Sequence, residues 1–526
     1  PPAGRFEART RRAGLDRWYD VWFDSLRSVT RATLDLSRLE GIECVEPVYA
    51  IRSIGPERAV AAPLPAATRT ASLPFDDPGL AKQWHYSNHG ADINLFRAWE
   101  VTAGSNDVVV AVVDGGIDYA HEDLVGNVGN WAELYGEEGV DDDGNGYVDD
   151  IYGWNFIYSS AYPYGSNKIT PVEHGTHVAG TIAAVNNNGV GVCGIAGGSG
   201  RGDGVKIMSC EILGKSESGS SGAGLAGQIR AIKYAADNGA VICQNSWGYT
   251  AGTISVTDWT RGSYSALSRA MEYFNKYAGL DENGNQTGPM AGGIVLFAAG
   301  NDASSEVCYP AADANAISVG ATAFTGAPAY YTNYGTWVQI SAPGGDQMLS
   351  NAYGGVYSTS VAADGSSGYE GSQGTSMACP HVSGACALAV SYYYGAEKRK
   401  GLTGEMLRQA LLGSTQSVDR YCTGKYQQYL GNMGIGSLDT YKLLRNIAKI
   451  DGIPAQRVGV GDTVSIDLSN HFTATNVLGY TVSVPDLVKI ELRGGVMKLT
   501  GLKKGRTTII VSDGAAIRKP IEVTVE

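Results

Sequence analysis

Several runs of apolar residues along the chain end directly in polar side chains. They include Val108–Val113 before Asp114, Ala240–Cys243 before Gln244, and Ile294–Ala299 before Gly300 and Asn301. Unbroken apolar runs of this kind are typical of strands that a parallel sheet buries on both faces. Ligands of such α/β sheets bind where the strands end. The pattern therefore predicts an α/β domain with Asp114 and Asn301 at one edge of its sheet, although each residue alone is also a common turn former.

Two segments rich in small residues predict buried helices, one starting near His174 and the other near Ser376. A helix N-terminus offers unpaired N–H groups and the positive end of the dipole, which favour negative charge on a bound oxygen. Ser376 could also be only an N-cap, and Pro380 is expected in the first helical turn. His174 is a candidate general base. The pair of His174 and His177 lacks the evident third ligand that a metal site needs.

The N-terminal residues 1–58 have the pattern of a small α+β domain. Residues 1–60 contain ten Arg, no Lys and nine Asp or Glu. Alternation predicts strands at Trp18–Phe23 and Ile42–Ile51, with a short helix at Ser28–Leu39 between them. Residues 59–78 lack periodicity and are rich in Ala, Pro and Thr, so we expect an exposed linker that is open to cleavage.

The C-terminal residues 452–526 predict a small β-sandwich. Short alternating segments separated by turns are expected at Asp462–Leu468, Tyr480–Val484, Val488–Leu492, Val496–Leu499, Thr507–Val511 and Ile521–Val525. This region looks like a bacterial immunoglobulin-like module. The helices Thr403–Leu412 and Thr440–Ile450 are expected to close the preceding domain, which would span residues 79–447.

Composition and charge exclude several classes of protein. A chain of 526 residues is too long for one compact core, and its 43% hydrophobic content predicts a globular protein. A net charge of −13 without a long basic run argues against a nucleic-acid partner. No apolar run reaches the ~20 residues that a transmembrane helix needs. The chain starts at Pro1, so we expect that an export signal has been removed from it.

The eight cysteines contain no CxxC pair, which argues against a zinc site. They are Cys44, Cys193, Cys210, Cys243, Cys308, Cys379, Cys386 and Cys422. Most lie among small apolar residues and are expected to be buried thiols, with one or two disulfides as the alternative.

Four of these motifs, taken together, resemble those of the subtilisin-like serine proteases. They are Asp114 in Asp-Gly-Gly-Ile-Asp, His174 in His-Gly-Thr-His-Val-Ala-Gly, Asn301 after Ala-Ala-Gly, and Ser376 in Gly-Thr-Ser-Met-Ala-Cys-Pro-His-Val. The order Asp, His, Ser along the chain is also the order of that family. The resemblance covers residues 79–447 and implies a subtilisin-like, mostly parallel sheet flanked by helices.

The resemblance implies a serine endopeptidase with a defined division of roles. Ser376 would attack the peptide carbonyl, and His174 would take its proton and pass it to the leaving amine. Asp114 would hold the imidazole and stabilise its charged form. The amide of Asn301 and the backbone N–H of Ser376 would bind the oxyanion.

The resemblance also implies where a polypeptide substrate binds. Ser246, Trp247 and Gly248 would line the cleft and pair with an extended substrate backbone, and Gly214 would begin the opposite rim. Trp247 replaces the usual aliphatic residue and is expected to narrow one wall. Cys308 stands where the family often has Gly, so we expect small or medium apolar side chains to be preferred before the scissile bond.

Residues 141–150 predict a calcium-binding loop, because oxygen donors alternate and glycines mark the turn, as in the first part of an EF-hand loop. The candidate ligands are Asp141, Asp143, Asn145, Tyr147, Asp149 and Asp150. The acidic residue expected at the end of an EF-hand loop is replaced by Tyr152, and flanking helices are not evident. We therefore expect an isolated Ca²⁺ loop, with an acidic turn that holds no cation as the alternative.

A second calcium site is implied by the resemblance alone. Gln83, Asp123, Val185 and Asn187 match segments that form a structural calcium site in many relatives. Asp281–Asn285 resembles a further loop of this kind, but turn chemistry is sufficient to explain it.

The resemblance gives the outer domains a role as well. Such proteases carry an α+β propeptide that assists folding and occupies the cleft until it is cut away, so residues 1–58 would be an intramolecular inhibitor and residues 59–78 the processing region. An unrelated small domain is the alternative. The enzyme would be secreted, or held at the cell surface or in the periplasm. The C-terminal domain would be a spacer, a docking module or a substrate-capture module.

Two rival hypotheses belong to other classes of protein. One is a catalytically idle cell-surface scaffold or adhesin with a decayed protease-like domain. The other is a different serine hydrolase, such as an esterase. The intact set of Asp114, His174, Ser376 and Asn301 argues against decay.

Overall fold

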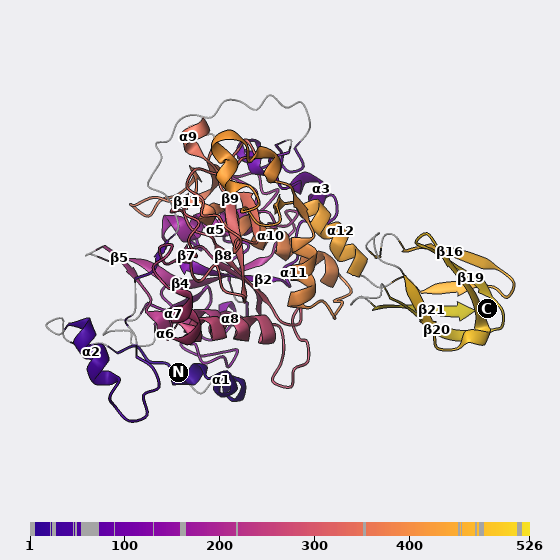
Figure 1. Ribbon diagram of the computed structural model, residues 1–526, viewed down its shortest axis with the longest axis horizontal. Helices are drawn as coiled ribbons and strands as arrows, with labels where there is room; N and C mark the ends of the chain where they lie inside the picture. The colour runs from indigo at the N-terminus through magenta and orange to yellow at the C-terminus, as the bar shows by residue number, and fades with distance from the viewer. Residues whose placement is uncertain are drawn as a thin grey trace. The chain divides into compact units, whose positions relative to one another are not determined.

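A computed structural model describes residues 6–21, 23, 28–45, 47, 50–53, 73–88, 90–129, 131–157, 165–216, 219–262, 264–350, 354–450, 453, 455–468, 471–472, 478–512 and 518–526. Its chain divides into two compact units, Pro1–Lys442 and Leu443–Glu526, and each is described by itself (Figure 1).

The first unit is organised around a large sheet of ten described strands. Their order is β13-β14-β10-β9-β8-β6-β2-β4-β3, with β5 paired to β4. The bounds are β2 Val109–Gly115, β3 Gly153–Asn155, β4 Lys206–Ser216, β5 Gly219–Gly222, β6 Ala240–Asn245, β8 Ile294–Ala298, β9 Ala316–Thr322, β10 Ile340–Pro343, β13 Thr415–Gln416 and β14 Ser437–Leu438. Every neighbouring pair is parallel except β13 with β14 and β4 with β5. The predicted α/β fold with a mostly parallel sheet is confirmed.

Helices cover both faces of this sheet (Figure 1). One face carries α6 (Leu225–Asp237) and α8 (Ser265–Tyr277), and the other carries α5 (Glu173–Ala183) and α10 (Thr375–Tyr394). In α8 the buried residues recur every three or four positions, as on a helix with one side toward the core. In contrast, α10 is buried almost all round, which its many Ala, Gly and Ser residues permit. The segment that begins near Ser376 therefore runs through the core of the unit.

Shorter elements complete the first unit. They are α3 Leu95–Trp99, α4 Trp131–Leu134, α7 Val256–Arg261, α9 Gln347–Ser350, α11 Gly404–Leu412, the hairpin of β11 Val356–Val361 and β12 Ser367–Ser372, and the short strand β7 Trp247–Gly248. The 3-10 turns are η2 Leu80–Lys82, η3 Trp84–Tyr86, η5 Asp419–Tyr421 and η6 Gly424–Tyr429. The division between the two units falls within α12, Thr440–Ile450. Both helices predicted near the end of this unit, α11 and α12, are present.

The N-terminal segment differs from the expected α+β pattern. It contains α1 (Glu7–Ala13), η1 (Leu15–Arg17), α2 (Val29–Leu36) and the two-residue strand β1 (Arg52–Ser53). The predicted helix is confirmed by α2, but the described parts of Trp18–Phe23 and Ile42–Ile51 form no strand. Trp18 instead packs against the core of the first unit. The apolar residue at Trp18 therefore serves a contact with the core of the first unit and not a strand of a separate N-terminal sheet.

The second unit is a sandwich of two sheets. One has the order β15-β21-β20-β17 and the other β16-β19-β18. The strands are β15 Gln456–Val458, β16 Thr463–Asp467, β17 Gly479–Val482, β18 Val488–Arg493, β19 Val496–Gly501, β20 Gly505–Ser512 and β21 Arg518–Val525, with the turn η8 at Pro485–Leu487. Buried residues from both sheets, among them Ile466, Met497 and Ile509, share one core. All six predicted strands are present, and only the short β15 lacked a clear alternating pattern.

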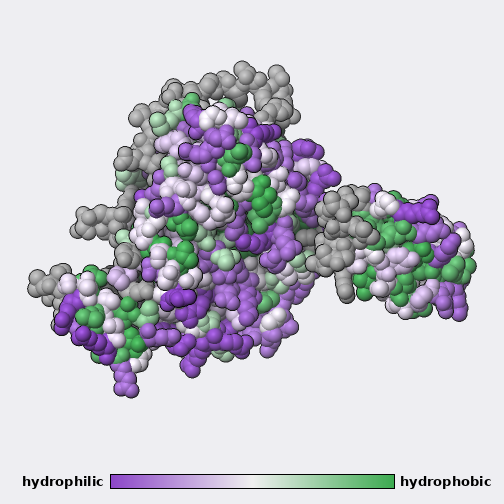
Figure 2. All heavy atoms as spheres, in the orientation of Figure 1, coloured by the Kyte–Doolittle hydropathy of each residue, from purple (hydrophilic) through white to green (hydrophobic). Residues whose placement is uncertain are grey.

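The surfaces of the two units differ in Figure 2. The visible face of the first unit is mostly hydrophilic, whereas hydrophobic residues recur across the visible face of the second. Exposed apolar side chains of the second unit include Val460, Tyr480 and Ile510. The described helices contain none that is long and apolar enough to cross a membrane.

Candidate active site

The candidate base and its carboxylate lie together at the carboxyl end of β2. Asp114 is fully buried in this strand, and His174 is the second residue of α5. Nδ1 of His174 lies 2.6 Å from Oδ1 of Asp114, which also accepts a 2.6 Å hydrogen bond from the N–H of Gly115. A Cβ atom on Gly175 would lie 2.1 Å from the carbonyl oxygen of Gly115. Glycine at this position therefore lets α5 begin close enough to β2 for His174 to meet Asp114.

The buried carboxylate controls the ionisation of the imidazole. Burial is the largest influence and lowers the pKa of His174, but the charge and hydrogen bond of Asp114, with the charge of Glu173, outweigh it and raise the pKa above 6.5. Nε2 of His174 has no hydrogen-bond partner in the described part of the chain. The imidazole can therefore accept a proton at Nε2 while Nδ1 remains held by Asp114.

Ser376 is the second residue of α10, which confirms its predicted place at a helix N-terminus. Gly374, directly before the helix, has a φ of 145°, a conformation that favours glycine. The hydroxyl of Ser376 donates to the carbonyl oxygen of Ser246 at 3.2 Å. The expected hydrogen bond between Ser376 and His174 is therefore not formed in this arrangement.

Pro380 lies deeper in α10 than the sequence predicts. The helix already begins at Thr375, so the prediction that Pro380 occupies its first turn is wrong. Proline has no N–H to donate to the carbonyl four residues earlier, which is that of Ser376. The hydroxyl of Ser246 donates to this carbonyl at 2.9 Å instead. Ser246 thus satisfies the group that Pro380 leaves without its helical partner and ties the end of β6 to α10.

Asn301 follows β8, and Thr375 fixes its side chain. Oδ1 of Asn301 accepts hydrogen bonds from the N–H of Thr375 at 3.0 Å and from its hydroxyl at 2.8 Å. The hydroxyl of Thr375 also accepts from the N–H of Gly300 at 3.1 Å. These bonds leave the Nδ2 end of the amide as the end that can donate to an oxyanion. Sequence reasoning missed Thr375, although its place directly before Ser376 was an available signal.

The candidate substrate edge is formed by Ser246 and the short strand β7, which directly follow β6. Strand β7 pairs antiparallel with β1, so that Arg52 is opposite Gly248 and Ser53 is opposite Trp247. The indole of Trp247 is fully buried and packs against the ring of Phe297, with 5.1 Å between the centroids. The prediction that Trp247 narrows the cleft is therefore wrong, because its side chain points into the core and only its backbone serves the edge.

The other candidate substrate contacts lie on either side of this edge. Cys308 is buried beside Gly300, because a Cβ atom added to Gly300 would lie 3.2 Å from Sγ of Cys308. Burial raises the pKa of the Cys308 thiol to about 12. Its thiol donates to the carbonyl of Tyr249 at 3.2 Å. Gly214, the candidate for the opposite rim, pairs with Ser221 in the antiparallel hairpin of β4 and β5.

The acidic loop brings two predicted ligands together with one that the sequence did not reveal. Carboxylate oxygens of Asp143, Asp150 and Glu133 all lie within 4.8 Å of one another. Oε2 of Glu133 and Oδ1 of Asp150 are buried and have no hydrogen-bond partner in the part of the chain described. Burial first, and then the neighbouring carboxylates, raise the pKa of Asp150 to about 7 and also raise that of Glu133. Glu133 comes from α4, so only the fold brings it to the loop.

Other predicted residues of this loop mainly support its turns. Asp141 accepts hydrogen bonds from the N–H groups of Asn145 and Gly146 at 3.0 and 2.8 Å. Asn145 donates to Asp150 at 2.9 Å and accepts from the N–H of Tyr147 at 2.7 Å. Both carboxylate oxygens of Asp149 instead accept from the N–H of Gly139 at 3.0 Å. Asn145 therefore reaches the acidic group, whereas the Asp149 side chain serves another turn.

At the second predicted calcium site, the predicted residues mostly bond to the protein itself, and a further carboxylate lies beside the loop. The amide of Gln83 is engaged with the backbone of Cys193, and the carboxylate beside the loop belongs to Asp77, which accepts from the N–H of Asn187 at 2.7 Å. Asp123 accepts from Asn188 and from the N–H of Val192, each at 2.8 Å. The N–H of Val185 donates to the carbonyl of Asp123 at 2.8 Å. Burial, its largest influence, and then the charges of Asp77 and Glu122 help to raise the pKa of Asp123 to about 7.

Two further sequence features have structural roles. All eight cysteines are described and none forms a disulfide bond, with Cys44 exposed and the other seven buried. Nε2 of His177 lies 3.0 Å from the carbonyl of Val356, and burial lowers the pKa of this imidazole to about 4. His177 is therefore a neutral core residue.

Comparisons with known proteins agree with this geometry. Residues 105–436 match the family model described as Peptidase_S8, subtilase family. The chain is 32% identical over 356 residues to an extracellular protease of Xanthomonas campestris pv. campestris, covering 67% of this chain and 55% of the relative. It is 31% identical over 331 residues to thermitase of Thermoactinomyces vulgaris, covering 63% of this chain and 88% of the relative. It is also 32% identical to a thermophilic serine proteinase of a Bacillus strain, covering 63% of this chain and 62% of the relative.

Solved structures support the same fold. A protease of Pseudoalteromonas arctica gives a TM-score of 0.51 at 26% identity, with 71% of this chain and 99% of the other covered. Fervidolysin of Fervidobacterium pennivorans, described as a keratinolytic enzyme related to subtilisin, gives 0.52 at 22% identity, with 92% of this chain and 64% of the other covered, and bears on the fold alone. The chain belongs to the subtilase family, whose relatives above are named as proteases. The matched part spans between 48% and 62% of the length of three of the curated relatives.

The raised pKa of His174 predicts an acid limit to activity against peptides. Only the neutral imidazole can take the proton of Ser376, so kcat/KM should fall as the pH drops through an apparent pKa above 6.5. The measurement is kcat/KM from pH 5 to pH 9, and a flat profile would contradict the role of His174.

Asp114→Asn should lower the rate of peptide hydrolysis about 10⁴-fold, because it removes the carboxylate that holds the imidazole in one tautomer and stabilises its charged form.

Proposed function

We propose that the protein is a serine endopeptidase that hydrolyses polypeptides through Asp114, His174 and Ser376 and is made as a self-processing zymogen. The observation that carries the proposal is the 2.6 Å contact between Nδ1 of His174 and the buried carboxylate of Asp114. The helix of His174, α5, packs against α10, the helix that carries Ser376. Membership of the subtilase family supports the same chemistry.

The reaction begins with a change at Ser376. Its hydroxyl leaves the carbonyl of Ser246 and turns toward Nε2 of His174, which takes the proton as Oγ attacks the substrate carbonyl. Nδ2 of Asn301 and the N–H of Ser376 stabilise the oxyanion that forms. His174 then returns the proton to the leaving amine, and water hydrolyses the acyl-enzyme by the same steps.

Substrates bind in an extended conformation along β7. The pairing of β1 with β7 supports this mode, because a segment of the chain itself already adds a strand to that edge. Backbone hydrogen bonds of this kind tolerate many sequences, and side-chain pockets add selectivity. The same pairing supports residues 1–58 as the intramolecular inhibitor, since the segment occupies the edge that a substrate needs.

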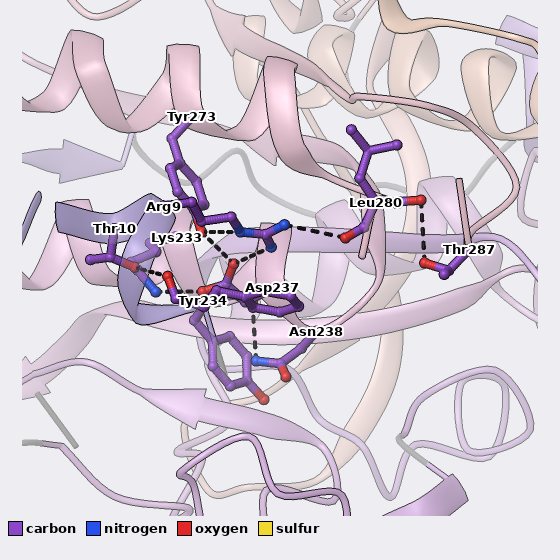
Figure 3. A network of polar contacts seen from close by, with 11 residues as sticks. Arg9, Thr10, Lys233, Tyr234, Asp237, Asn238, Tyr273, Leu280 and Thr287 are labelled. Carbon is purple, nitrogen blue, oxygen red and sulfur yellow. Dashed lines mark hydrogen bonds and ion pairs between the residues drawn. The ribbon is translucent and has the colours of Figure 1, made fainter. Parts of the chain in front are cut away.

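A second contact anchors the N-terminal segment far along the chain from β1. Figure 3 shows Arg9 of α1 between Tyr273 of α8 and Asp237 of α6. Its guanidinium donates to the Tyr273 hydroxyl at 2.7 Å, to Asp237 at 2.8 Å and to the carbonyl of Leu280 at 3.2 Å. The side chains of Arg9 and Asp237 are 7% and 12% exposed. A guanidinium buried to this degree is stable only while its partners remain, so Arg9 ties the segment to the two helices.

We propose that Glu133, Asp143 and Asp150 hold a structural Ca²⁺ ion. Oε2 of Glu133 and Oδ1 of Asp150 are buried without a hydrogen-bond partner in the described part of the chain, and with a carboxylate oxygen of Asp143 they suit a hard cation that prefers oxygen ligands. The ion would offset the mutual repulsion that helps to raise the pKa of Asp150. The second calcium site stays a prediction, in which the carboxylate of Asp77 accepts from the N–H of Asn187 and the amide of Gln83 is bonded to Cys193.

The relatives support a location for the enzyme outside the cytoplasm. Two of them are named as extracellular proteases, which supports export of this protein to the outside of the cell, to its surface or to the periplasm. The C-terminal sandwich would then act as a spacer, a docking module or a substrate-capture module. A catalytically idle scaffold remains the alternative, and the variant of Ser376 described next separates the two.

Ser376→Ala should abolish both hydrolysis of casein and labelling by a fluorophosphonate probe, because it removes the nucleophile. The full-length wild-type chain should label and should release an N-terminal fragment, whereas the variant should stay intact. Labelling that persists in the variant would contradict the assignment of the nucleophile, and a wild-type chain inert toward both reagents would favour the idle scaffold.

Arg9→Ala should loosen the N-terminal segment, because removing one partner of a buried ion pair costs about 3–5 kcal/mol. The measurement is the rate at which added trypsin removes the segment, in the Ser376→Ala background so that self-cleavage cannot interfere. Arg11→Ala is the matched control, since Arg11 is 68% exposed and, among the described residues, its ion pair is with Glu7 of the same helix. Equal digestion of the two variants would contradict the anchoring role of Arg9.

Removing calcium should lower the melting temperature by several degrees, because an ion present at 100 times its Kd stabilises the folded state by about 2.7 kcal/mol. Affinity should fall as the pH drops below 7, where protons compete for Asp150. Glu133→Gln should reduce the response to chelator and to added calcium. Asp281→Asn should not, because Asp281 serves only the turn at Asn283 and Asn285. A melting temperature insensitive to chelator would refute the site.

A further inference from the structure

Asp302, the residue directly after Asn301, forms an ion pair with Arg52 of β1. The carboxylate is 18% exposed and is held in place, because its Oδ2 accepts from the N–H of Ala251 and from Nδ2 of Asn333, each at 3.2 Å. Among the described residues, Arg52 is the only cation that pairs with Asp302. The catalytic unit therefore presents a fixed acidic group at the substrate edge, and the N-terminal segment supplies its counter-charge.

The strand register tells which position of a bound peptide reaches Asp302. Arg52 is opposite Gly248, and Ser53 is opposite Trp247. A bound substrate that continues this register places its next residue opposite Ser246, which exchanges hydrogen bonds with Ser376. The bond after that residue is then the one nearest the nucleophile. A side chain in the place of Arg52 belongs to the third residue before the bond that is cut.

Neighbouring contacts hold this register. Ile51, directly before Arg52, is 7% exposed and belongs to the core cluster of the first unit. Its Cγ1 would lie 3.0 Å from a Cβ placed on Gly222 of the opposite rim. Because side chains alternate along an extended strand, a slip by one residue would move Ile51 out of this contact and Arg52 away from Asp302.

We propose that Asp302 makes the protease selective for a basic side chain, and above all arginine, at the third residue before the scissile bond. The proposal rests on the proposed endopeptidase function and names a substrate class for it. Once the N-terminal segment has left, the carboxylate has no counter-charge, so an arginine in a substrate restores the ion pair. A glutamate at the same position places two negative charges together and is rejected.

The same selectivity applies to the chain's own processing. The residue that follows Ser53 is Ile54, which lies outside the described residues, and the continued register puts the scissile bond after it. The N-terminal segment thus presents arginine at the position that Asp302 reads. The processed protein is therefore expected to begin at Gly55, which places this cut four residues before the processing region of residues 59–78 that composition predicts.

The test compares quenched fluorogenic peptides that carry Ala-Ile-X-Ser-Ile-Gly-Pro, the sequence of residues 50–56, with X as arginine, citrulline or glutamate. Citrulline keeps the shape of arginine without its charge. The wild-type full-length chain, after self-processing, should cleave the arginine peptide about tenfold faster in kcat/KM than the citrulline peptide, as expected for a partly exposed charged hydrogen bond. The glutamate peptide should be slower still, and added salt should narrow the preference.

Two variants locate the effect. Asp302→Asn should make the arginine and citrulline peptides nearly equal substrates. Glu306→Gln removes an exposed charge from the same loop and should leave the preference unchanged. Equal cleavage of the arginine and citrulline peptides by the wild type would overturn the proposal while leaving the endopeptidase function intact, and this comparison does not depend on the folding of any variant. Failure to cleave casein or any of the peptides would overturn the proposed function, and the selectivity with it.

Discussion

The contact between buried Asp114 and His174 is the interaction on which the site depends. A carboxylate within a sheet is costly to bury unless it is paired and hydrogen-bonded, and here the imidazole and the N–H of Gly115 supply the partners of Oδ1. The same contact commits Nδ1 to the carboxylate and leaves Nε2 for proton transfer. The parallel sheet and the close approach that Gly175 allows are the structural means by which a base is formed from two distant residues.

The other groups at the site are positioned by hydrogen bonds that also satisfy the backbone. Pro380 leaves the carbonyl of Ser376 without a helical partner, and the hydroxyl of Ser246 replaces it. Thr375 similarly holds the oxygen of Asn301. The nucleophile helix, the substrate edge and the candidate oxyanion donor are therefore parts of one network. Movement in any one of them would disturb the others, which favours a preorganised site.

The N-terminal segment uses two contacts to stay on the first unit. Arg9 is buried against Asp237 and Tyr273, and β1 adds a strand to β7. Both contacts precede the proposed cut after Ile54, so the cut leaves them on one fragment and removes only the covalent link that keeps this fragment at high effective concentration beside the first unit. The proposed selectivity would link this arrangement to substrate choice, because Asp302, which pairs with Arg52, lies directly after Asn301.

The sequence by itself determined the parallel sheet, the placement of Ser376 at the start of a buried helix, and the strands of the second unit. Apolar runs, small-residue segments and alternation are local patterns, and burial follows from them directly. The tertiary structure alone decided the direction of the Trp247 side chain, the arrival of Glu133 at the acidic loop, the pairing of Arg9 with Asp237 and the place of Arg52 beside Asp302. Each of these depends on which distant segments meet, and contacts between segments far apart along the chain leave no periodic trace in either one.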